Sequence, residues 1–486
     1  MKKRNVILTA MMAGSLLTTL SSCDKFEDFG STNSNPNQTT APNTAALLTN
    51  TLSGMGGYAW GNAYTTNGAL YAQYMSETQY TDASRYATPT INWTGTYTGP
   101  LLDLQNTIDF NSNAETAAVA AENGSNANQI ATARILKAYI YWVLTDSYGD
   151  IPYFEALKGD GALAYDNQSE IYPDLIKELK EAADQFDGGA VYRGDIIYGG
   201  DVTKWKKFAN SVRLLMAMRL SKVNAGMAQA EVASALSHPA GVIESNADNF
   251  SLDYPGGIYN HPIYQYYMIT KRFDYALSKT VTDNQVAYND RRAEAFGSTT
   301  VGFPYGLERG DAVTFANTNT NWAWVFAEDQ RDMDDEIVIL SASQVWLTIA
   351  EARQRTWASG SVADAYNTGI RLSWEQWGVF DQTDYNNYIA SANVNLSSNA
   401  LIKIHLQQWL AFFPNGTQGW ANWRRTGVPA LTPAPGTGTP DLPIPRRLPY
   451  GPDEFNLNKT NADAGADKYT VGGVKNSQNA RVWWDN

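Results

Sequence analysis

Residues 131–152, which read ATARILKAYIYWVLTDSYGDIP, decide the fold of this chain. Apolar side chains recur there with the i, i+3, i+4, i+7 spacing of one buried helix face, at Leu136, Tyr139, Ile140, Val143 and Leu144. Gly149 follows the periodic stretch and Pro152 lies just beyond it, which is typical of a helix end. The segment therefore predicts a helix that buries one face against a neighbouring element.

Further helical patterns occur in pairs on both sides of this segment. The predicted pairs are Leu101–Ala121 with the helix above, Tyr172–Phe186 with Thr203–Val223, Ser343–Ala358 with Val362–Trp377, and an earlier pair from Thr44 to about Met75. About four such pairs, each covering the apolar face of the next, are typical of a tetratricopeptide-like scaffold. The repeat spacing is irregular, so the likeness is architectural. The sequence predicts a mainly α fold with long irregular loops and minor β structure, in which Trp142, Trp205 and Trp346 are core residues.

Three long polar and aromatic stretches lie between the predicted helices, at Gln79–Gly99, Asn246–Ala276 and Gly297–Asp335. Loops of this length are uncommon unless they are functional. Indole and phenol rings stack on the apolar faces of sugars, and their polar atoms reach neighbouring groups. The candidate ligand-binding residues are Tyr80, Arg85, Tyr86 and Trp93 in the first loop, Tyr259, Tyr264 and Tyr267 in the second, and Asn321, Trp322 and Trp324 in the third.

Two alternatives remain open for these residues. Extended peptides could use the same rings, with Asn and Gln bonding the peptide backbone. Each ring could instead pack under its own loop. Trp322 and Trp324 are two residues apart, so they share one face only if their segment is extended.

The N-terminus has the pattern of a cleavable signal peptide. Lys2, Lys3 and Arg4 precede an apolar run, Val6–Leu20, that is too short to span a bilayer comfortably. The run ends in Leu-Ser-Ser-Cys23, which resembles the lipobox of bacterial lipoproteins, in which the cysteine is lipidated. Cys23 is the only cysteine, so no internal disulfide is possible, and the alternative is a free thiol or an intermolecular disulfide.

The expected organisation is a signal peptide at residues 1–22, a lipid anchor and flexible tether at 23–43, and a single domain at 44–486. The formal charge is −13, and loss of the three basic residues of the signal peptide would take it to −16. An acidic protein is a poor candidate for binding nucleic acid or for lying flat on anionic lipid.

Most common catalytic patterns are missing from the sequence. His238, His261 and His405 are the only histidines, and none has metal-ligand spacing. There is no G-x-S-x-G pattern and no Gly-Lys dipeptide of a P-loop. The acidic run Arg331–Glu336 suggests calcium, but it lacks the EF-hand pattern, and such runs are usually solvated loops. We expect a protein without enzymatic activity, metal or cofactor, although a hydrolase that needs only two carboxylates stays possible.

Several segments, in order along nearly the whole chain, resemble the SusD/RagB family of nutrient-binding outer-membrane lipoproteins of Bacteroidota. They are CDKFED at 23–28, NSNPN at 33–37, the YGDIP helix at 131–152, KWKKFANS at 204–211 with AMR at 217–219, QVWL at 344–347 with AEA at 350–352, WANWRRTG at 420–427 and RVWWD at 481–485. The chain departs from the family pattern at Trp423, where Asp is common, and at Gln407-Gln408, which replace an acidic–basic pair.

The resemblance implies a function that composition and periodicity do not reveal. It implies a lipoprotein at the cell surface, attached to the outer membrane through Cys23, that caps a SusC-like TonB-dependent barrel and delivers an oligomeric nutrient to it. In the family the loop before the AEA helix often carries a ligand-stacking aromatic residue, as Trp322 and Trp324 would here. Glycans are the commoner nutrient, and peptides are the alternative. A surface hydrolase and an adaptor without a ligand of its own are the other hypotheses.

Overall fold

The computed structural model describes residues 42–159, 161–190, 192–436 and 443–486. Residues Thr44–Asn486 form one compact unit. The predicted signal peptide, Cys23 and all but the end of the predicted tether lie outside the described residues, so the expected domain boundaries stay predictions.

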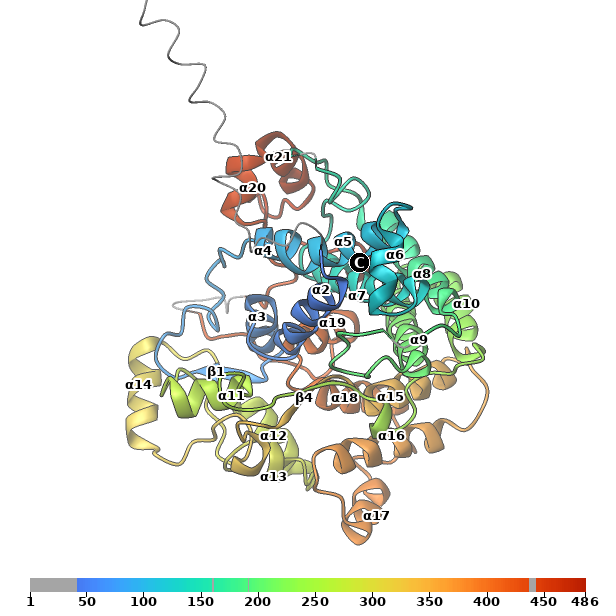
Figure 1. The fold of residues 1–486 in the computed structure, drawn as a ribbon. Helices are drawn as coiled ribbons and strands as arrows, with labels where there is room; N and C mark the ends of the chain where they lie inside the picture. The colour runs from blue at the N-terminus through green and yellow to red at the C-terminus, as the bar shows by residue number, and fades with distance from the viewer. Residues whose placement is uncertain (1–41, 160, 191, 437–442) are drawn as a thin grey trace, which may run out of the picture. The chain divides into compact units, whose positions relative to one another are not determined.

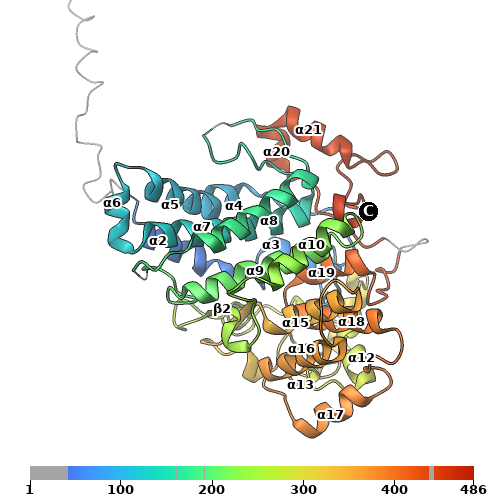
Figure 2. The same ribbon diagram turned by 90° about the vertical axis from the view of Figure 1, so that its right-hand side faces the viewer.

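The first half of this unit is built from helices that pack in chain order (Figures 1 and 2). After α5 (Leu102–Ser112) and the short α6 (Ala117–Ala120), α7 (Asn126–Tyr148) packs on α5 and on α8 (Gln168–Gln185). Then α8 packs on α9 (Val202–Arg219), and α9 packs on α10 (Ala225–Leu236). This arrangement confirms the predicted tetratricopeptide-like helix pairs in this region.

The end of α7 is fixed as the sequence predicts. Gly149 follows the last helical residue with φ +88°, a left-handed conformation that favours glycine. A Cβ atom at Gly149 would also collide with the phenol of Tyr469. The backbone N–H of Asp150 donates to that same phenol oxygen at 2.9 Å, so the YGD turn is packed against the C-terminal part of the chain.

The predicted pair between Thr44 and Met75 does not form as a pair. The segment contains α2 (Thr44–Ser53) and α3 (Ala63–Tyr71), but α2 packs mainly on α5 and α3 mainly on α19 (Gly416–Thr426). A close backbone approach explains the second contact, because Gly68 of α3 faces Gly416 without room for a Cβ atom on either residue.

The second half of the unit is centred on α15 (Ala342–Gln354), which packs on α16 (Val362–Gln376) as predicted and also on α18 (Ala400–Phe412). A capping box of Ser341 and Gln344 starts α15. The remaining helices are α4 (Thr94–Thr96), α11 (Pro262–Tyr264), α12 (Lys279–Tyr288), α13 (Ala293–Phe296), α14 (Arg309–Thr318), α17 (Gln382–Ala390), α20 (Pro452–Leu457) and α21 (Lys459–Lys468).

The β structure of the described residues consists of two small antiparallel sheets. One pairs β1 (Met75–Glu77) with β3 (Tyr275–Leu277) and the other pairs β2 (Phe250–Asp253) with β4 (Glu336–Leu340). Each pair joins segments about 90 to 200 residues apart in the chain. The sheets therefore fix the long loops relative to the helices.

The core contains large aromatic side chains from both halves of the chain. Trp142 and Trp205 are fully buried, as predicted. Trp346 differs from the prediction, because it is only half-buried and its indole N–H donates to the carbonyl of Glu244 at 3.0 Å. Near the chain end, Trp484 is fully buried and its indole N–H donates to Asp146 of α7 at 2.8 Å.

Candidate functional site

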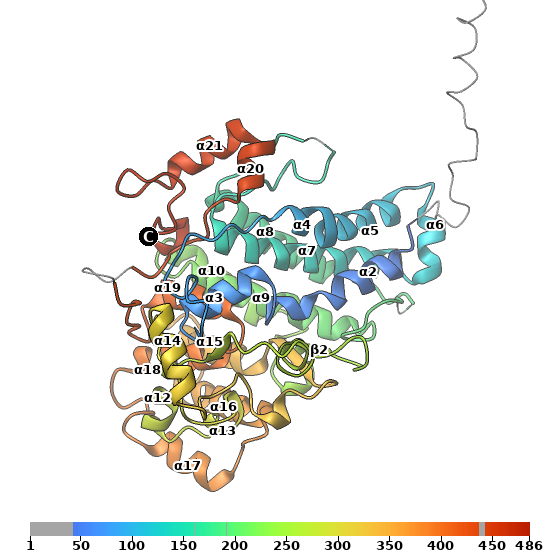
Figure 3. The ribbon, with the colours of Figure 1, turned by 90° about the vertical axis from the view of Figure 1, so that its left-hand side faces the viewer.

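Segments from the three predicted loops are hydrogen-bonded to one another. The β1–β3 pairing aligns Met75 with Leu277, and the N–H of Leu277 donates to the carbonyl of Ala323 at 2.9 Å. We call the resulting region the loop surface, which comprises three segments: residues 77–86, residues 256–275, and residues 305–331 without 319 and 320. It lies on the side of the unit that carries β1, α11 and α14, which Figure 3 views face-on (Figures 1 and 3).

Tyr267 joins the second and third segments of the loop surface. Its hydroxyl donates to the carbonyl of Tyr275 at 2.8 Å and accepts the N–H of Val325 at 3.0 Å. Burial raises the pKa of Tyr267 above its ordinary value, so the phenol stays protonated and both hydrogen bonds persist. Tyr267 is therefore a structural centre of this surface, although the sequence suggested it as a ligand contact.

Trp324 lies beside Tyr267 with its ring held in place by neighbours. The two rings are stacked with centroids 5.3 Å apart and an interplanar angle of 15°. Phe273 packs on Trp324 at 4.9 Å, and the guanidinium carbon of Arg331 lies 5.1 Å from its ring centroid. Trp324 is half-buried, so these neighbours do not cover the residue completely.

Trp322 contacts a different cluster. Its ring meets Phe303 edge-on at 5.8 Å, within a small core that includes Ala276, Ala312 and Phe315. Trp322 is half-buried as well. The two tryptophans thus belong to separate aromatic clusters and do not form one continuous pair.

Tyr80 is the most exposed aromatic residue of the first loop, with 51% of its surface accessible. The guanidinium carbon of Arg309 lies 5.2 Å from its ring centroid. A cation over one face of a phenol orients the ring and leaves the other face free to stack. Arg309 was not identified from the sequence, because only the fold brings the first turn of α14 to this loop.

Arg85 ties the first loop to α14. Its guanidinium forms an ion pair with Glu308 at 2.5 Å and donates to the carbonyls of Gly306 at 2.8 Å and Pro435 at 2.9 Å. The sequence suggested that the Arg85 guanidinium bonds a ligand, but its N–H groups already bond these three partners. In this structure Arg85 therefore positions the loop.

Glu77 lies beneath the first loop and accepts hydrogen bonds from it. One of its carboxylate oxygens accepts the backbone N–H of Ser84 at 2.7 Å and the Ser84 hydroxyl at 2.9 Å. Burial raises the pKa of Glu77 to about 7, against the lowering effect of these hydrogen bonds. The loop that presents Tyr80 therefore depends on a carboxyl group that titrates near neutral pH.

The other predicted residues of the second and third loops reach the surface to different extents. Tyr259 is 64% exposed, Asn321 is exposed and Tyr264 is half-buried. Tyr86 is buried, and its hydroxyl accepts the N–H of Ala434 at 3.1 Å.

Trp93 is not part of the loop surface. It is 4% exposed, its ring meets Tyr148 edge-on at 4.9 Å, and its indole N–H donates to Glu454 at 2.6 Å. The second half of the first loop therefore packs on the end of α7 and on the C-terminal segment. No face of Trp93 is left for a ligand.

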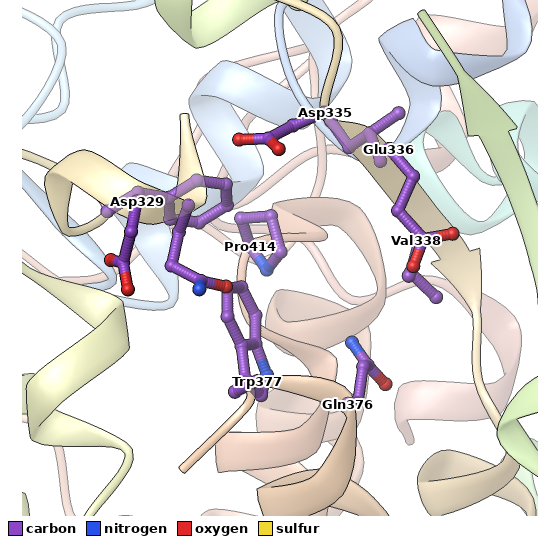
Figure 4. Close-up of a pocket in the computed structure, with 10 residues that line it drawn as sticks. Asp329, Asp335, Glu336, Val338, Gln376, Trp377 and Pro414 are labelled. Atoms are coloured by element: carbon purple, nitrogen blue, oxygen red, sulfur yellow. The ribbon is translucent and has the colours of Figure 1, made fainter. Parts of the chain in front are cut away.

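A cavity of about 190 Å³ adjoins the third segment, and we call it the acidic cavity (Figure 4). Figure 4 shows Asp329 on one side and Asp335 and Glu336 on the other, with Trp377 and Pro414 between them. Gln330, Gln376 and Phe326 complete the part of the lining relevant here. Carboxylates and amides around an indole ring suit a ligand with hydroxyl groups.

Sequence reasoning missed Trp377, since it is the last residue of a predicted helix and only the fold places it beside residues 329–336. Burial raises the pKa of Asp335, against the lowering effect of the hydrogen bond that its carboxylate accepts from the backbone N–H of Asp332. Within the described ranges, no three His, Cys, Asp or Glu side chains lie close enough together to hold a metal ion. In the same part of the chain, no helix has the length and apolar character needed to cross a bilayer.

Comparison with known families gives a match over most of the chain. The matching family model is described as "Starch-binding associating with outer membrane" and covers residues 36–451. A search of curated proteins returned no match.

Solved structures with the same fold cover about nine-tenths of the chain. A chitin-binding protein is 28% identical, with a TM-score of 0.77 over 91% of this chain and 100% of that one. A SusD homologue from Bacteroides uniformis is 23% identical, with a TM-score of 0.75 over 92% and 100% of the two chains. A chitin-binding SusD homologue from Flavobacterium johnsoniae is 23% identical, with a TM-score of 0.72 over 91% and 98%.

Proposed function

Since this chain belongs to the SusD-like family, whose description associates it with starch binding and the outer membrane, we propose that it captures an oligosaccharide outside the cell. The proposal includes a lipid anchor on Cys23 and transfer of the oligosaccharide to a SusC-like TonB-dependent transporter. The protein would bind its ligand without chemical turnover. A peptide ligand is the alternative that the binding experiment below addresses.

The observation that carries the proposal is the end-to-end similarity to a chitin-binding protein at 28% identity. The match covers 91% of this chain and 100% of the chitin-binding protein, which supports a shared general role. Chitin oligosaccharides are therefore the first ligands to test, followed by starch oligosaccharides.

The loop surface supports the proposal through its fixed and partly exposed rings. Trp324 is held by Tyr267 and Phe273, so a sugar that stacks on it would not have to order the ring first. Tyr80 offers a second ring whose orientation Arg309 fixes. The acidic cavity adds carboxylate and amide groups that accept and donate hydrogen bonds to hydroxyls.

The test is calorimetric titration of soluble protein that starts at Asp24. Chitin oligosaccharides, starch oligosaccharides and a mixed peptide pool would each be titrated into the native protein and into Trp324→Ala. Loss of one stacking ring should weaken binding on the order of tenfold. Trp357→Ala is the matched control, because Trp357 is also half-buried but lies at the end of α15, outside the loop surface.

Saturable binding of one oligosaccharide class, weakened by Trp324→Ala and not by Trp357→Ala, would support both the ligand class and the site. Saturable heat with peptides alone would replace the oligosaccharide by a peptide. If no ligand of either class binds the native protein, the capture function proposed for the isolated chain is wrong.

A further inference from the structure

A cavity of about 600 Å³ lies between the second half of the first loop and the C-terminal segment. We call it the C-terminal cavity. Its lining residues belong to three stretches, 88–90, 449–456 and 471–479, of which Asp453 and Glu454 do not line the cavity. The predicted binding residue Trp93 packs behind this region, on Tyr450, with ring centroids 5.5 Å apart.

The walls of the C-terminal cavity are fixed by hydrogen bonds. Asn476 accepts the N–H of Tyr450 at 2.9 Å and donates to the Tyr450 carbonyl at 3.1 Å. On the opposite side, Asn92 accepts the N–H of Asp453 at 3.1 Å. A ligand would therefore find these walls already in position, which lowers the entropy cost of binding.

One wall is a tight hairpin. Val471 and Val474 exchange two backbone hydrogen bonds of 3.0 Å, and the turn between them is Gly472-Gly473, with φ of +58° and +80°. Two consecutive positive φ angles are typical of the type I′ turn, which glycine adopts without strain. The turn holds both valine side chains at the cavity although Val471 is 43% and Val474 61% exposed.

The cavity combines apolar and amide groups without a free charge. Pro89, Pro449, Pro452 and Phe455 contribute apolar surface beside the two valines. Lys475 is the one charged residue among the described lining residues, and Asp467 neutralises it at 2.5 Å.

Two amide oxygens of the lining have unused acceptor capacity. The side-chain oxygens of Gln478 and Asn479 are buried and have no hydrogen-bond partner. A buried acceptor without a partner is costly, so these side chains gain if they turn towards the cavity and accept a hydroxyl or amide N–H of a ligand. Apolar walls, amide acceptors and no free charge together match a neutral sugar chain better than a charged one.

The first loop connects this cavity to the loop surface. The Gln478 side-chain amide donates to the backbone carbonyl of Tyr86 at 2.7 Å, one residue from Arg85. Thr88, Pro89 and Thr90 then line the cavity itself. Figure 1 shows this part of the chain running from β1 towards α4, so one segment borders both places.

We infer that the C-terminal cavity is a second contact site for a neutral oligosaccharide, reached by chains long enough to extend along residues 80–90 from the loop surface. The inference rests on the proposed function. It adds that long neutral oligomers gain contacts which short ones do not.

The experiment compares chitotriose and chitohexaose by calorimetry on soluble protein that starts at Asp24, with maltotriose and maltohexaose as the second pair. The test variant is Val474→Ser combined with Asn456→Ala, because both residues are exposed cavity residues whose loss leaves the core intact. A second variant, Val474→Trp, narrows the mouth of the cavity. Val119→Ser, at a residue 50% exposed on α6, is the matched control.

For whichever sugar binds, we expect the double variant to weaken the hexasaccharide about fivefold and to leave the trisaccharide unchanged. Val474→Trp should act in the same direction, and Val119→Ser should change neither. Native-like hexasaccharide binding in both cavity variants would overturn the inference. The proposed function is tested separately, by Trp324→Ala. Equal losses for both lengths would also overturn it, and absence of binding to the native protein would remove the proposed function with it.

Discussion

At the scale of single residues, Glu77 couples the conformation of the first loop to pH. Its carboxyl is buried beneath the loop, where Ser84 donates two hydrogen bonds to it. Burial raises its pKa from 4.5 to about 7. Tyr80 and Arg85 follow directly in the chain, so the protonation of Glu77 bears on the part of the loop surface that they form.

The raised pKa predicts a pH-dependent stability. Between pH 4.5 and about 7 the folded chain keeps the Glu77 proton and the unfolded chain loses it. This contribution to the free energy of unfolding is therefore fully present below pH 4.5 and is lost as pH rises to about 7, a change of about 3 kcal/mol at most. Glu77→Gln should remove this slope.

The pH dependence of the free energy of unfolding is measured by urea unfolding of the native protein and of Glu77→Gln between pH 4.5 and 8. The difference in free energy of unfolding should shift in favour of the variant as pH rises. Glu115→Gln, at an exposed glutamate, should follow the native curve. Parallel curves for Glu77→Gln and the native protein would contradict the assignment.

Individual site residues were only partly predictable from the sequence. Trp93 and Trp324 both lie in long polar loops, yet Trp93 is buried against Tyr148 and Trp324 remains half-exposed. Loop composition does not distinguish them, because the distinction depends on partners outside the local sequence, such as Tyr148 and Glu454 for Trp93 and Tyr267 for Trp324. Trp93 bonds Glu454, and Arg309 reaches Tyr80, only through the fold.

At the scale of elements, α15 is joined to α19 by a buried ion pair. Arg425 donates to both carboxylate oxygens of Glu351, at 2.6 and 2.7 Å, and Gln408 of α18 donates to the same group at 2.9 Å. Burial alone would raise the pKa of Glu351, but the charge of Arg425 lowers it well below the ordinary value. The family pattern has a charged residue at position 408. Gln408 instead donates a hydrogen bond to the Glu351 carboxylate without adding a charge.

Removing one partner of this pair should destabilise the helix contacts strongly. Arg425→Met leaves the buried carboxylate with the half-buried Arg355, at 2.9 Å, as its remaining cation, so the cost should lie at the lower end of the about 3–5 kcal/mol of a fully unpaired buried charge. The double variant Glu351→Leu/Arg425→Met should recover most of that loss. Chemical denaturation measures both, with Arg371→Met as the control, because the Arg371–Glu375 pair is partly exposed and is worth about 1 kcal/mol or less.

A single variant with native stability, or a double variant no better than the single one, would show that the pair does not hold α15 to α19.

Helix pairing was predictable where the paired helices are neighbours in sequence. The periodicity of residues 131–148 predicted α7 and its contacts, and the pair α15–α16 was also correct. The partners of α2 and α3 were not predictable, because α3 packs on α19 some 350 residues later through two facing glycines. Local patterns identify a buried face but not the element that covers it.

At the scale of the whole molecule, the proposed attachment to the membrane would depend on Cys23, which lies outside the described residues. We predict that Cys23→Ser moves the protein from the membrane fraction to the soluble fraction, because the lipid chains that anchor it can no longer be attached. Fractionation of cells and mass spectrometry of the N-terminal peptide measure the result. Ser21→Ala should remain membrane-bound, and a Cys23→Ser protein that also stays in the membrane fraction would contradict lipid anchoring.

The mainly α fold as a whole could be predicted, whereas the binding region could be predicted only as a set of loops. Helical periodicity is a local property that residues 131–148 already display. The loop surface arises from the β1–β3 pairing and from the bonds of Tyr267, and the acidic cavity arises when Trp377 meets residues 329–336. Each is a long-range contact between segments with weak local signals.

The bonds between the three loop segments also determine how ligand preference could be exchanged between relatives. A chimera that receives only residues 75–86 from another protein would pair a foreign β1 with the native β3, and one that receives only 262–277 from a relative without a tyrosine at position 267 would lose the hydrogen bond to Val325. The helices can serve as a constant frame, because they do not supply these bonds. With the loop surface as the proposed binding site, specificity would be transplanted as one block of three segments, and not loop by loop.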